Sequence, residues 1–250
     1  MLKLVFSVFG VALAVTPVTA APQETNAVLL NQGEQIYQDN CALCHQVSGT
    51  GSPPTFPALN GNALLGNAAR IVRSIQQGTD QMPPFPYLTI EEISAVTSYI
   101  RKAWQNTWDD VDIEEVASTL EGSTASDQMT SVWDTVFTEE QANRGQAVYQ
   151  GACGLCHGRR LNGAPDDPDM SSTPPLARAR FLRIWGGRSL ATLFSYIRAT
   201  MPESNPNSLT EQEYTDVIAY MLSVGGMPTG NEELPTDLQQ LAHMFIQPRP

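Results

Sequence analysis

Apolar residues recur every three or four positions in two stretches of the chain, near residues 90–100 and 211–222. This spacing places them along one face of an α-helix. Each stretch opens with Thr-x-x-Glu, a capping box in which the two side chains satisfy free backbone N–H groups at a helix start. The apolar positions are Ile90, Ile93, Val96 and Ile100 in the first stretch and Tyr214, Val217, Ile218 and Met221 in the second.

Shorter helices are predicted at 33–40, 68–77 and 190–200, and Thr138-x-x-Gln141 predicts the start of one more. The segments between them are rich in Pro, Gly and Asn and are expected to be loops. The pattern therefore predicts an all-α fold. Small helical domains with long loops form a poor core alone, so additional apolar volume is needed.

A small domain occurs twice in the sequence. Residues 33–45 and 145–157 agree at seven of thirteen positions, and residues 88–99 are echoed by 209–220 with nine extra residues between the two blocks. This pattern indicates a tandem duplication. We predict unit one over 27–105, an acidic linker over 106–137, unit two over 138–230 and a C-terminal tail over 231–250.

The first 20 residues predict a secretory signal peptide. Lys3 precedes an apolar run over 4–15, and Val18-Thr19-Ala20 fits a small-residue cleavage site. The run is too short to cross a bilayer, although an uncleaved anchor is the alternative. No later segment is long and apolar enough to cross a membrane, so we expect a periplasmic mature chain without a transmembrane anchor.

Each unit carries the motif Cys-x-x-Cys-His, as Cys41, Cys44 and His45 in unit one and as Cys153, Cys156 and His157 in unit two. Two thiols at this spacing can bind the two vinyl groups of a haem covalently, and the adjacent His can bind the iron. A redox Cys-x-x-Cys needs no adjacent His, and a zinc site usually has its two cysteine pairs closer together. Disulfides are the remaining alternative. The motifs predict two covalently bound haem c groups.

The methionines provide candidates for the second axial ligand of each iron. Met82-Pro83 and Met201-Pro202 occupy matching places before the last helix of each unit, and each Met is a candidate iron ligand. Core packing is the alternative use of a Met. Met170 competes in unit two, whereas His243 is expected to be a solvated surface residue.

The order of first helix, haem motif, Pro-rich loop, Met-Pro and last helix resembles class I cytochromes c, twice over. The resemblance implies that a proline carbonyl in the loop accepts a hydrogen bond from the haem-binding His. Pro57 is the candidate in unit one, and Pro174 or, preferentially, Pro175 in unit two; ordinary loop prolines are the alternative. It also implies one-electron transfer at each iron rather than catalysis.

Residues 181–190 with Met201-Pro202 are similar to the cytochrome domain of pyrroloquinoline quinone (PQQ) dehydrogenases, and unit one resembles a domain of the cytochrome subunit of membrane-bound alcohol dehydrogenases. This resemblance implies a PQQ-dependent dehydrogenase as electron donor, and another cytochrome, an oxidase or the quinone pool as acceptor. Trp185 and Arg188 are expected near the haem of unit two. A dihaem enzyme of the peroxidase or thiosulfate dehydrogenase type, with one substrate-accessible haem, is the alternative.

Charge refines the choice of partners. The formal net charge is −12, and residues 106–137 hold eight acidic and no basic side chains. This segment is either a steering patch for a basic partner or a solvated linker. The negative charge disfavours nucleic acid as a ligand. Four arginines surround Trp185 and are candidates for a docking site or for contacts with the haem: Arg178, Arg180, Arg183 and Arg188.

Overall fold

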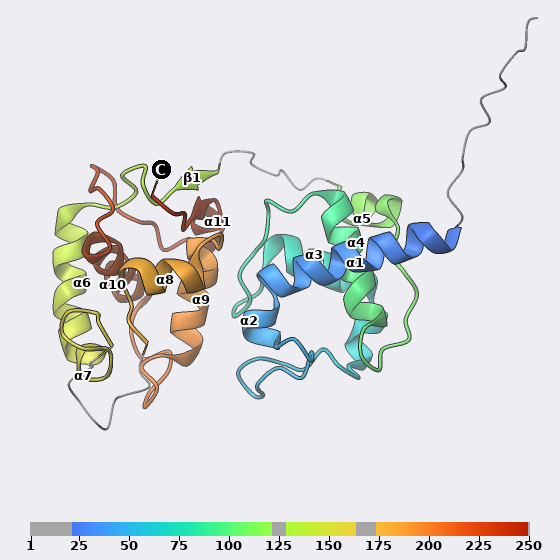
Figure 1. The fold of residues 1–250 in the computed structure, drawn as a ribbon, viewed down its shortest axis with the longest axis horizontal. Coiled ribbons are helices and arrows are strands. Elements are labelled where there is room, and N and C mark those ends of the chain that lie inside the picture. Colours follow the sequence, from blue (N-terminus) through green and yellow to red (C-terminus); the bar gives the residue numbers. More distant parts are fainter. Residues whose placement is uncertain (1–21, 122–128, 164–173, 250) are drawn as a thin grey trace, which may run out of the picture.

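The computed structural model describes residues 22–121, 129–163 and 174–249, so the predicted signal peptide lies outside the described residues. Figure 1 shows two helical units side by side, unit one in blue to green and unit two in yellow-green to red. Among the described residues, no helix has the length and apolar character needed to cross a membrane. The all-α fold of two tandem units is confirmed.

Unit one is built on the crossing of its first and last long helices. Its elements are α1 (Pro22–Asn40), α2 (Ala42–His45), a 3₁₀ turn (Ala63–Gly66), α3 (Ala68–Gln77), α4 (Ile90–Lys102) and α5 (Ile113–Thr119). Gly33 permits the crossing, since a Cβ there would lie 2.1 Å from the carbonyl oxygen of Ala95 on α4. The capping box of Thr89 and Glu92 starts α4 as predicted. Helix α1 is much longer than the expected 33–40.

Unit two repeats this plan with additions. Its elements are β1 (Thr130–Ser131), α6 (Glu139–Ala152), α7 (Gly154–His157), α8 (Arg178–Trp185), α9 (Leu190–Thr200), α10 (Glu211–Val224), α11 (Leu238–Leu241) and β2 (Met244–Phe245). Gly145 has the role of Gly33: a Cβ there would lie 1.8 Å from the carbonyl oxygen of Asp216 on α10. Thr138 caps α6 and Thr210 opens α10 with its predicted capping box. Helix α8 was not predicted and lies within the longer loop of this unit.

The predicted linker of 106–137 is largely folded onto the two units. Val111 and Val116 are buried in the core of unit one, and the Ser94 hydroxyl donates to the Val111 carbonyl at 2.6 Å. Val132 and Phe137 belong to the core of unit two instead. The predicted linker was therefore too long, because apolar residues near both of its ends are buried in the core of the adjacent unit.

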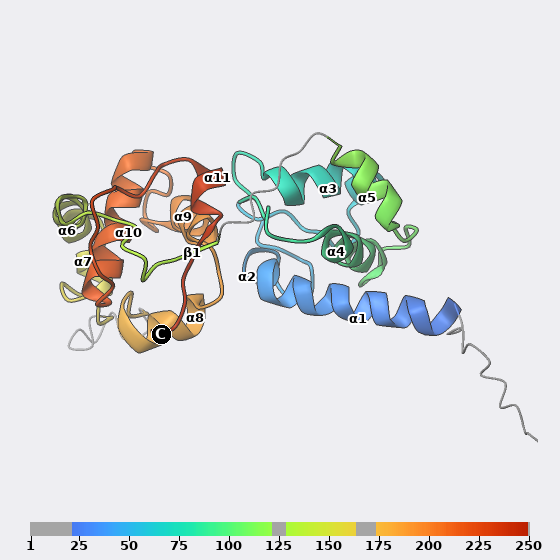
Figure 2. The same cartoon turned by 90° about the horizontal axis from the view of Figure 1, so that it is seen from above.

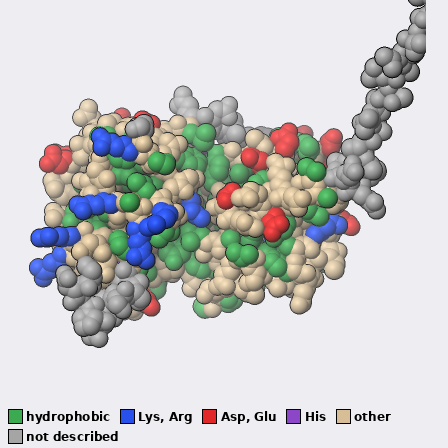
Figure 3. Space-filling model, in the orientation of Figure 1, with side chains coloured by type: hydrophobic (Ala, Val, Ile, Leu, Met, Phe, Trp, Pro, Cys, Tyr) green, Lys and Arg blue, Asp and Glu red, His purple; other side chains and the backbone are tan. Residues whose placement is uncertain are grey.

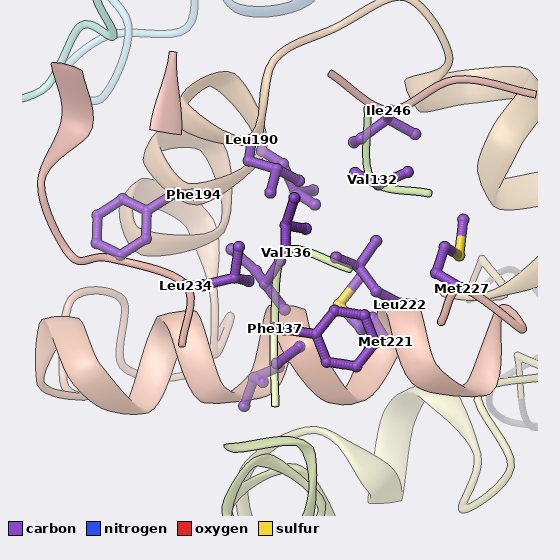
Figure 4. Close-up of a cluster of buried hydrophobic side chains, with 14 of the residues drawn as sticks. Val132, Val136, Phe137, Leu190, Phe194, Met221, Leu222, Met227, Leu234 and Ile246 are labelled. Carbon is purple, nitrogen blue, oxygen red and sulfur yellow. The ribbon is translucent and has the colours of Figure 1, made fainter. Parts of the chain in front are cut away.

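The predicted tail of 231–250 is also part of unit two. Leu234, Leu241 and Ile246 are fully buried in its core, several of whose members appear in Figure 4. Strand β2 pairs in parallel with β1, which joins the end of the chain to the start of the unit. His243 lies in this pairing segment and is half-buried rather than fully solvated.

The two units meet through several contacts. The Gln239 side chain donates to the Gln77 carbonyl at 2.9 Å, and Arg198 donates to the Asp80 carbonyl. The rings of Tyr87 and Phe245 meet edge to face, with centroids 4.9 Å apart. Figures 1 and 2 both show α9 on the side of unit two that faces unit one. The interface thus holds α9 beside the first Cys-x-x-Cys-His motif.

Candidate haem-binding sites

The two Cys-x-x-Cys-His motifs have the same backbone geometry. In each unit the long first helix runs directly into a four-residue helix that ends on the histidine, at His45 and His157. The backbone N–H of the histidine donates to the backbone carbonyl of the first cysteine at 2.9 Å in both copies. One helical turn therefore brings the two thiols and the imidazole of each motif together. None of the four cysteines forms a disulfide.

Each motif histidine is oriented by a proline carbonyl. The Nδ1 of His45 lies 2.9 Å from the Pro57 carbonyl oxygen, and the Nδ1 of His157 lies 2.9 Å from that of Pro174. The sequence left Pro174 and Pro175 open and favoured Pro175; the structure places Pro174 at this position. With Nδ1–H donating to a carbonyl, Nε2 carries the free lone pair that can bind a metal.

A tyrosine from the first helix anchors the backbone after each motif. The Tyr37 hydroxyl donates to the Gln46 carbonyl at 2.6 Å, and the Tyr149 hydroxyl donates to the Gly158 carbonyl at 2.8 Å. Both tyrosines are fully buried. Tyr37 and Tyr149 are among the seven matching positions of the internal repeat. The hydrogen bonds of their hydroxyls, however, are visible only in the structure.

In unit one the predicted site residues surround one cavity of about 340 Å³. Cys41, Cys44, His45 and Met82 all line it, although they come from two separate parts of the chain. This volume lies within the range of about 300–1,000 Å³ found for ligand pockets. The remaining wall is mostly apolar and includes Leu59, Leu65, Ile71, Ile75 and Val96. Two thiols, an imidazole and a thioether around an apolar cavity fit a haem.

Burial sets the acid–base behaviour of these side chains. It raises the pKa of Cys41 to about 12, and those of Cys44 and Cys153 to about 11. Burial lowers the pKa of His45, an effect partly offset by its hydrogen bond to Pro57. His45 is therefore favoured as neutral imidazole, which is the form that binds metals.

In unit two Met201 follows directly after α9, where its N–H caps the helix by donating to the Ile197 carbonyl at 2.7 Å. The Tyr214 hydroxyl donates to the Met201 carbonyl at 3.0 Å and fixes the backbone at this position. Met201 is half-buried. The competing Met170 lies outside the described residues.

Trp185 packs on α9, and the charge of Arg188 acts on side chains of unit one. Trp185 ends α8 and packs edge to face against Tyr196, with ring centroids 5.4 Å apart. Burial raises the pKa values of Cys44 and Tyr87, and the positive charge of Arg188 offsets part of the rise in both. The expectation that Trp185 and Arg188 lie near the haem of unit two stays a prediction.

The comparisons agree with this geometry. Residues 28–100 and 140–221 match the sequence model of the family described as cytochrome c oxidase, cbb3-type, subunit III. The matched regions follow the two units and comprise more than half of the chain, so the protein belongs to this family of cytochrome c domains. Cytochromes c carry covalently bound haem c and transfer electrons.

Similar proteins include a cytochrome subunit of a dehydrogenase, an oxidase subunit and a dehydrogenase. The chain is 33% identical to the cytochrome c subunit of a quinone alcohol dehydrogenase of Gluconobacter oxydans, over 30% of this chain and 19% of the relative. It is 26% identical to the cbb3-type cytochrome c oxidase subunit CcoP of Azospirillum brasilense, over 78% of this chain and 61% of the relative. It is 32% identical to a polyvinylalcohol dehydrogenase of Sphingopyxis, over 43% of this chain and 16% of the relative. The chain spans less than two thirds of the length of each.

Proposed function

We propose that this protein is a periplasmic dihaem c-type cytochrome that carries single electrons from a PQQ-dependent dehydrogenase to the respiratory chain. The observation that carries this proposal is the repeated constellation of two cysteines, a proline-oriented histidine and a methionine. When bound, each haem supplies a one-electron Fe(III)/Fe(II) couple. Cys41 and Cys44 attach the first haem, and Cys153 and Cys156 attach the second.

The axial ligands are His45 and Met82 in unit one and His157 and Met201 in unit two. A His/Met pair raises the reduction potential and suits electron transfer. It also occupies both axial positions, which disfavours the alternative of a dihaem enzyme with a substrate-accessible iron. The prediction that the mature chain begins after a cleaved signal peptide remains part of the proposal, since covalent haem attachment of this kind takes place outside the cytoplasm.

The surface of unit two provides a docking site for the redox partner. Leu155, inside the second motif, is 79% exposed, and Cys156 beside it is also exposed. Figure 3 shows arginine side chains gathered over unit two and acidic side chains over unit one. Charge complementarity therefore favours an acidic partner surface at this site. The exposed arginines of unit two include Arg159, Arg160, Arg178, Arg180 and Arg183.

Rapid mixing with a reduced PQQ-dependent dehydrogenase tests the donor. Both haems should be reduced, at a rate that falls as salt is added, because exposed charges are screened. Arg183→Glu should slow the reduction, whereas Arg73→Glu on α3 of unit one is the matched control with the same charge change on an exposed arginine. An unreduced cytochrome would remove this donor from the proposal.

The match to the oxidase subunit CcoP covers the larger share of this chain and favours a second candidate, a role on the oxidase side of electron transfer. Co-purification separates the two candidates. Recovery of the cytochrome with oxidase subunits and not with a dehydrogenase would favour the second.

A further inference from the structure

The cavity of unit one is not closed by unit one alone. Ser195 and Tyr196, both on α9 of unit two, line it together with the first motif and Met82. The Tyr196 ring lies nearly parallel to that of Phe56 across the interface, with centroids 6.1 Å apart and an interplanar angle of 15°. Phe56 lines the same cavity and directly precedes Pro57, which orients His45.

Ser195 gives an independent indication that the cavity binds a ligand with a polar group. The residue is only 4% exposed, and within the described parts of the chain its hydroxyl has no hydrogen-bond partner. A buried hydroxyl without a partner is costly. Because Ser195 lines the cavity, a polar group of the ligand can satisfy it, and the carboxylates are the polar groups at the edge of a haem.

The other contacts across the interface hold α9 in this place. Arg198, one turn after Ser195, donates to the Asp80 carbonyl just before Met82. Leu43, the middle residue of the first motif, packs against the apolar core of unit two. Contacts with unit one therefore hold α9 beside the cavity.

We propose that unit two completes the haem pocket of unit one, with Tyr196 packing on the first haem and the Ser195 hydroxyl donating a hydrogen bond to it. This inference rests on the proposed function. It makes α9 a shared element, because the same helix delivers Met201 to the second site. Tyr196 and Met201 are five residues apart, which corresponds to about 7.5 Å along a helix axis.

The test uses the full-length, haem-loaded protein and reads each haem separately. Haem methyl proton resonances of the oxidised protein are recorded by NMR, and those of the first haem are identified as the set altered by Met82→Ala. Tyr196→Ala should shift this set and lower the midpoint potential of that haem, because water gains access to it. Tyr196→Phe should retain most of the wild-type potential.

Ser195→Ala distinguishes a ligand contact from a merely structural role. If the hydroxyl is simply buried without a partner, its removal should stabilise the protein and leave the first haem unchanged. If it binds the haem, the resonances and potential of the first haem should shift. Tyr220→Ala, at a half-buried tyrosine of α10 that does not line the cavity, is the control for general loosening of unit two.

First-haem resonances that stay unchanged in both Tyr196→Ala and Ser195→Ala would overturn the inference. That result would leave the dihaem cytochrome intact, since both haems would still be observed. A preparation without haem would instead contradict the proposed function itself.

Discussion

Leu43 and Leu155 occupy the same position in the two Cys-x-x-Cys-His motifs but have opposite surroundings. Leu43 packs against the core of unit two, whereas Leu155 is 79% exposed. The local structure around them is the same, down to the tyrosine that anchors the following loop and the proline that orients the histidine. The comparison teaches that each repeat encodes its own ligand set, while the packing of the units determines which site is covered.

Unit two covers Leu43 of the first motif, whereas Leu155 and Cys156 of the second motif are exposed, although His157 itself is buried. Ser195 and Tyr196 of unit two line the cavity of unit one, and exposed Arg159 and Arg160 follow the second motif closely in the chain. The account therefore makes unit two the point of exchange with external partners.

The largest effect is expected from removal of the axial methionines. Met82→Ala and Met201→Ala should each lower the reduction potential of one haem, on the order of 100 mV or more, because axial ligands set haem potentials over a range of about 0.8 V. Each variant should also remove about half of the weak absorption band that arises from Met–iron coordination. Redox titration with optical detection checks both. A band that is unchanged in either variant would show that the corresponding Met is not a ligand.

The helix crossings should be the most sensitive structural positions. Gly33→Ala and Gly145→Ala place a Cβ 2.1 Å and 1.8 Å from a carbonyl oxygen of the opposite helix, so the helices must separate. We expect a loss of about 3 kcal/mol or slightly more in the free energy of unfolding, since overpacking a core costs about 1–3 kcal/mol and occasionally more. Urea unfolding followed by circular dichroism measures it.

Gly151 is the matched control for these substitutions. It lies on α6 like Gly145, but a Cβ there meets nothing within 4 Å. Gly151→Ala should therefore be neutral or stabilise the protein by about 0.5–1 kcal/mol through higher helix propensity. Equal destabilisation by all three substitutions would contradict the role assigned to the crossings.

The two motif leucines should respond differently to the same change. Leu43→Ser should lower the free energy of unfolding by about 1–2 kcal/mol, because it removes apolar surface that is partly buried against unit two. Leu155→Ser should alter stability by no more than about 0.5 kcal/mol, but should slow reduction by the external donor. Urea unfolding and stopped-flow reduction separate the two outcomes. Identical behaviour of the two variants would contradict the distinction between a covered and an open site.

The smallest difference between the units is expected at the N-caps of their last long helices. Thr89→Ala and Thr210→Ala each remove the N-cap of a last helix, which typically costs about 1 kcal/mol. The two losses should be similar, because both threonines form the same capping box. Thermal unfolding of the two variants provides the check. A large difference between them would indicate that one helix depends on contacts outside its own unit.

Much of the fold could be predicted from the sequence because its signals are local. The range 68–77 and the range 190–200 agree with α3 and α9, and both Thr-x-x-Glu boxes start helices. The common geometry of the two Cys-x-x-Cys-His motifs is likewise local, because each motif forms a single helical turn. Such features depend on residues a few positions apart, and their spacing is visible in the chain.

Features that depend on long-range packing could not be predicted in this way. Composition made 106–137 an acidic linker, yet Val111 and Val132 are buried in different units. Burial raises the pKa of Cys44 and the charge of Arg188 offsets part of that rise, an effect between the units that no spacing in the sequence indicates. Ser195 and Tyr196 carried no signal at all, because their importance arises from the contact between the units.

The central claim is that one polypeptide holds two covalently attached haems. Intact mass of the purified, exported protein, combined with quantification of haem as its pyridine complex, tests it most directly. The account predicts two haems per chain, with one lost in a Cys41→Ser, Cys44→Ser variant and the other lost in a Cys153→Ser, Cys156→Ser variant. A wild-type protein with a single haem, or with none, would contradict it.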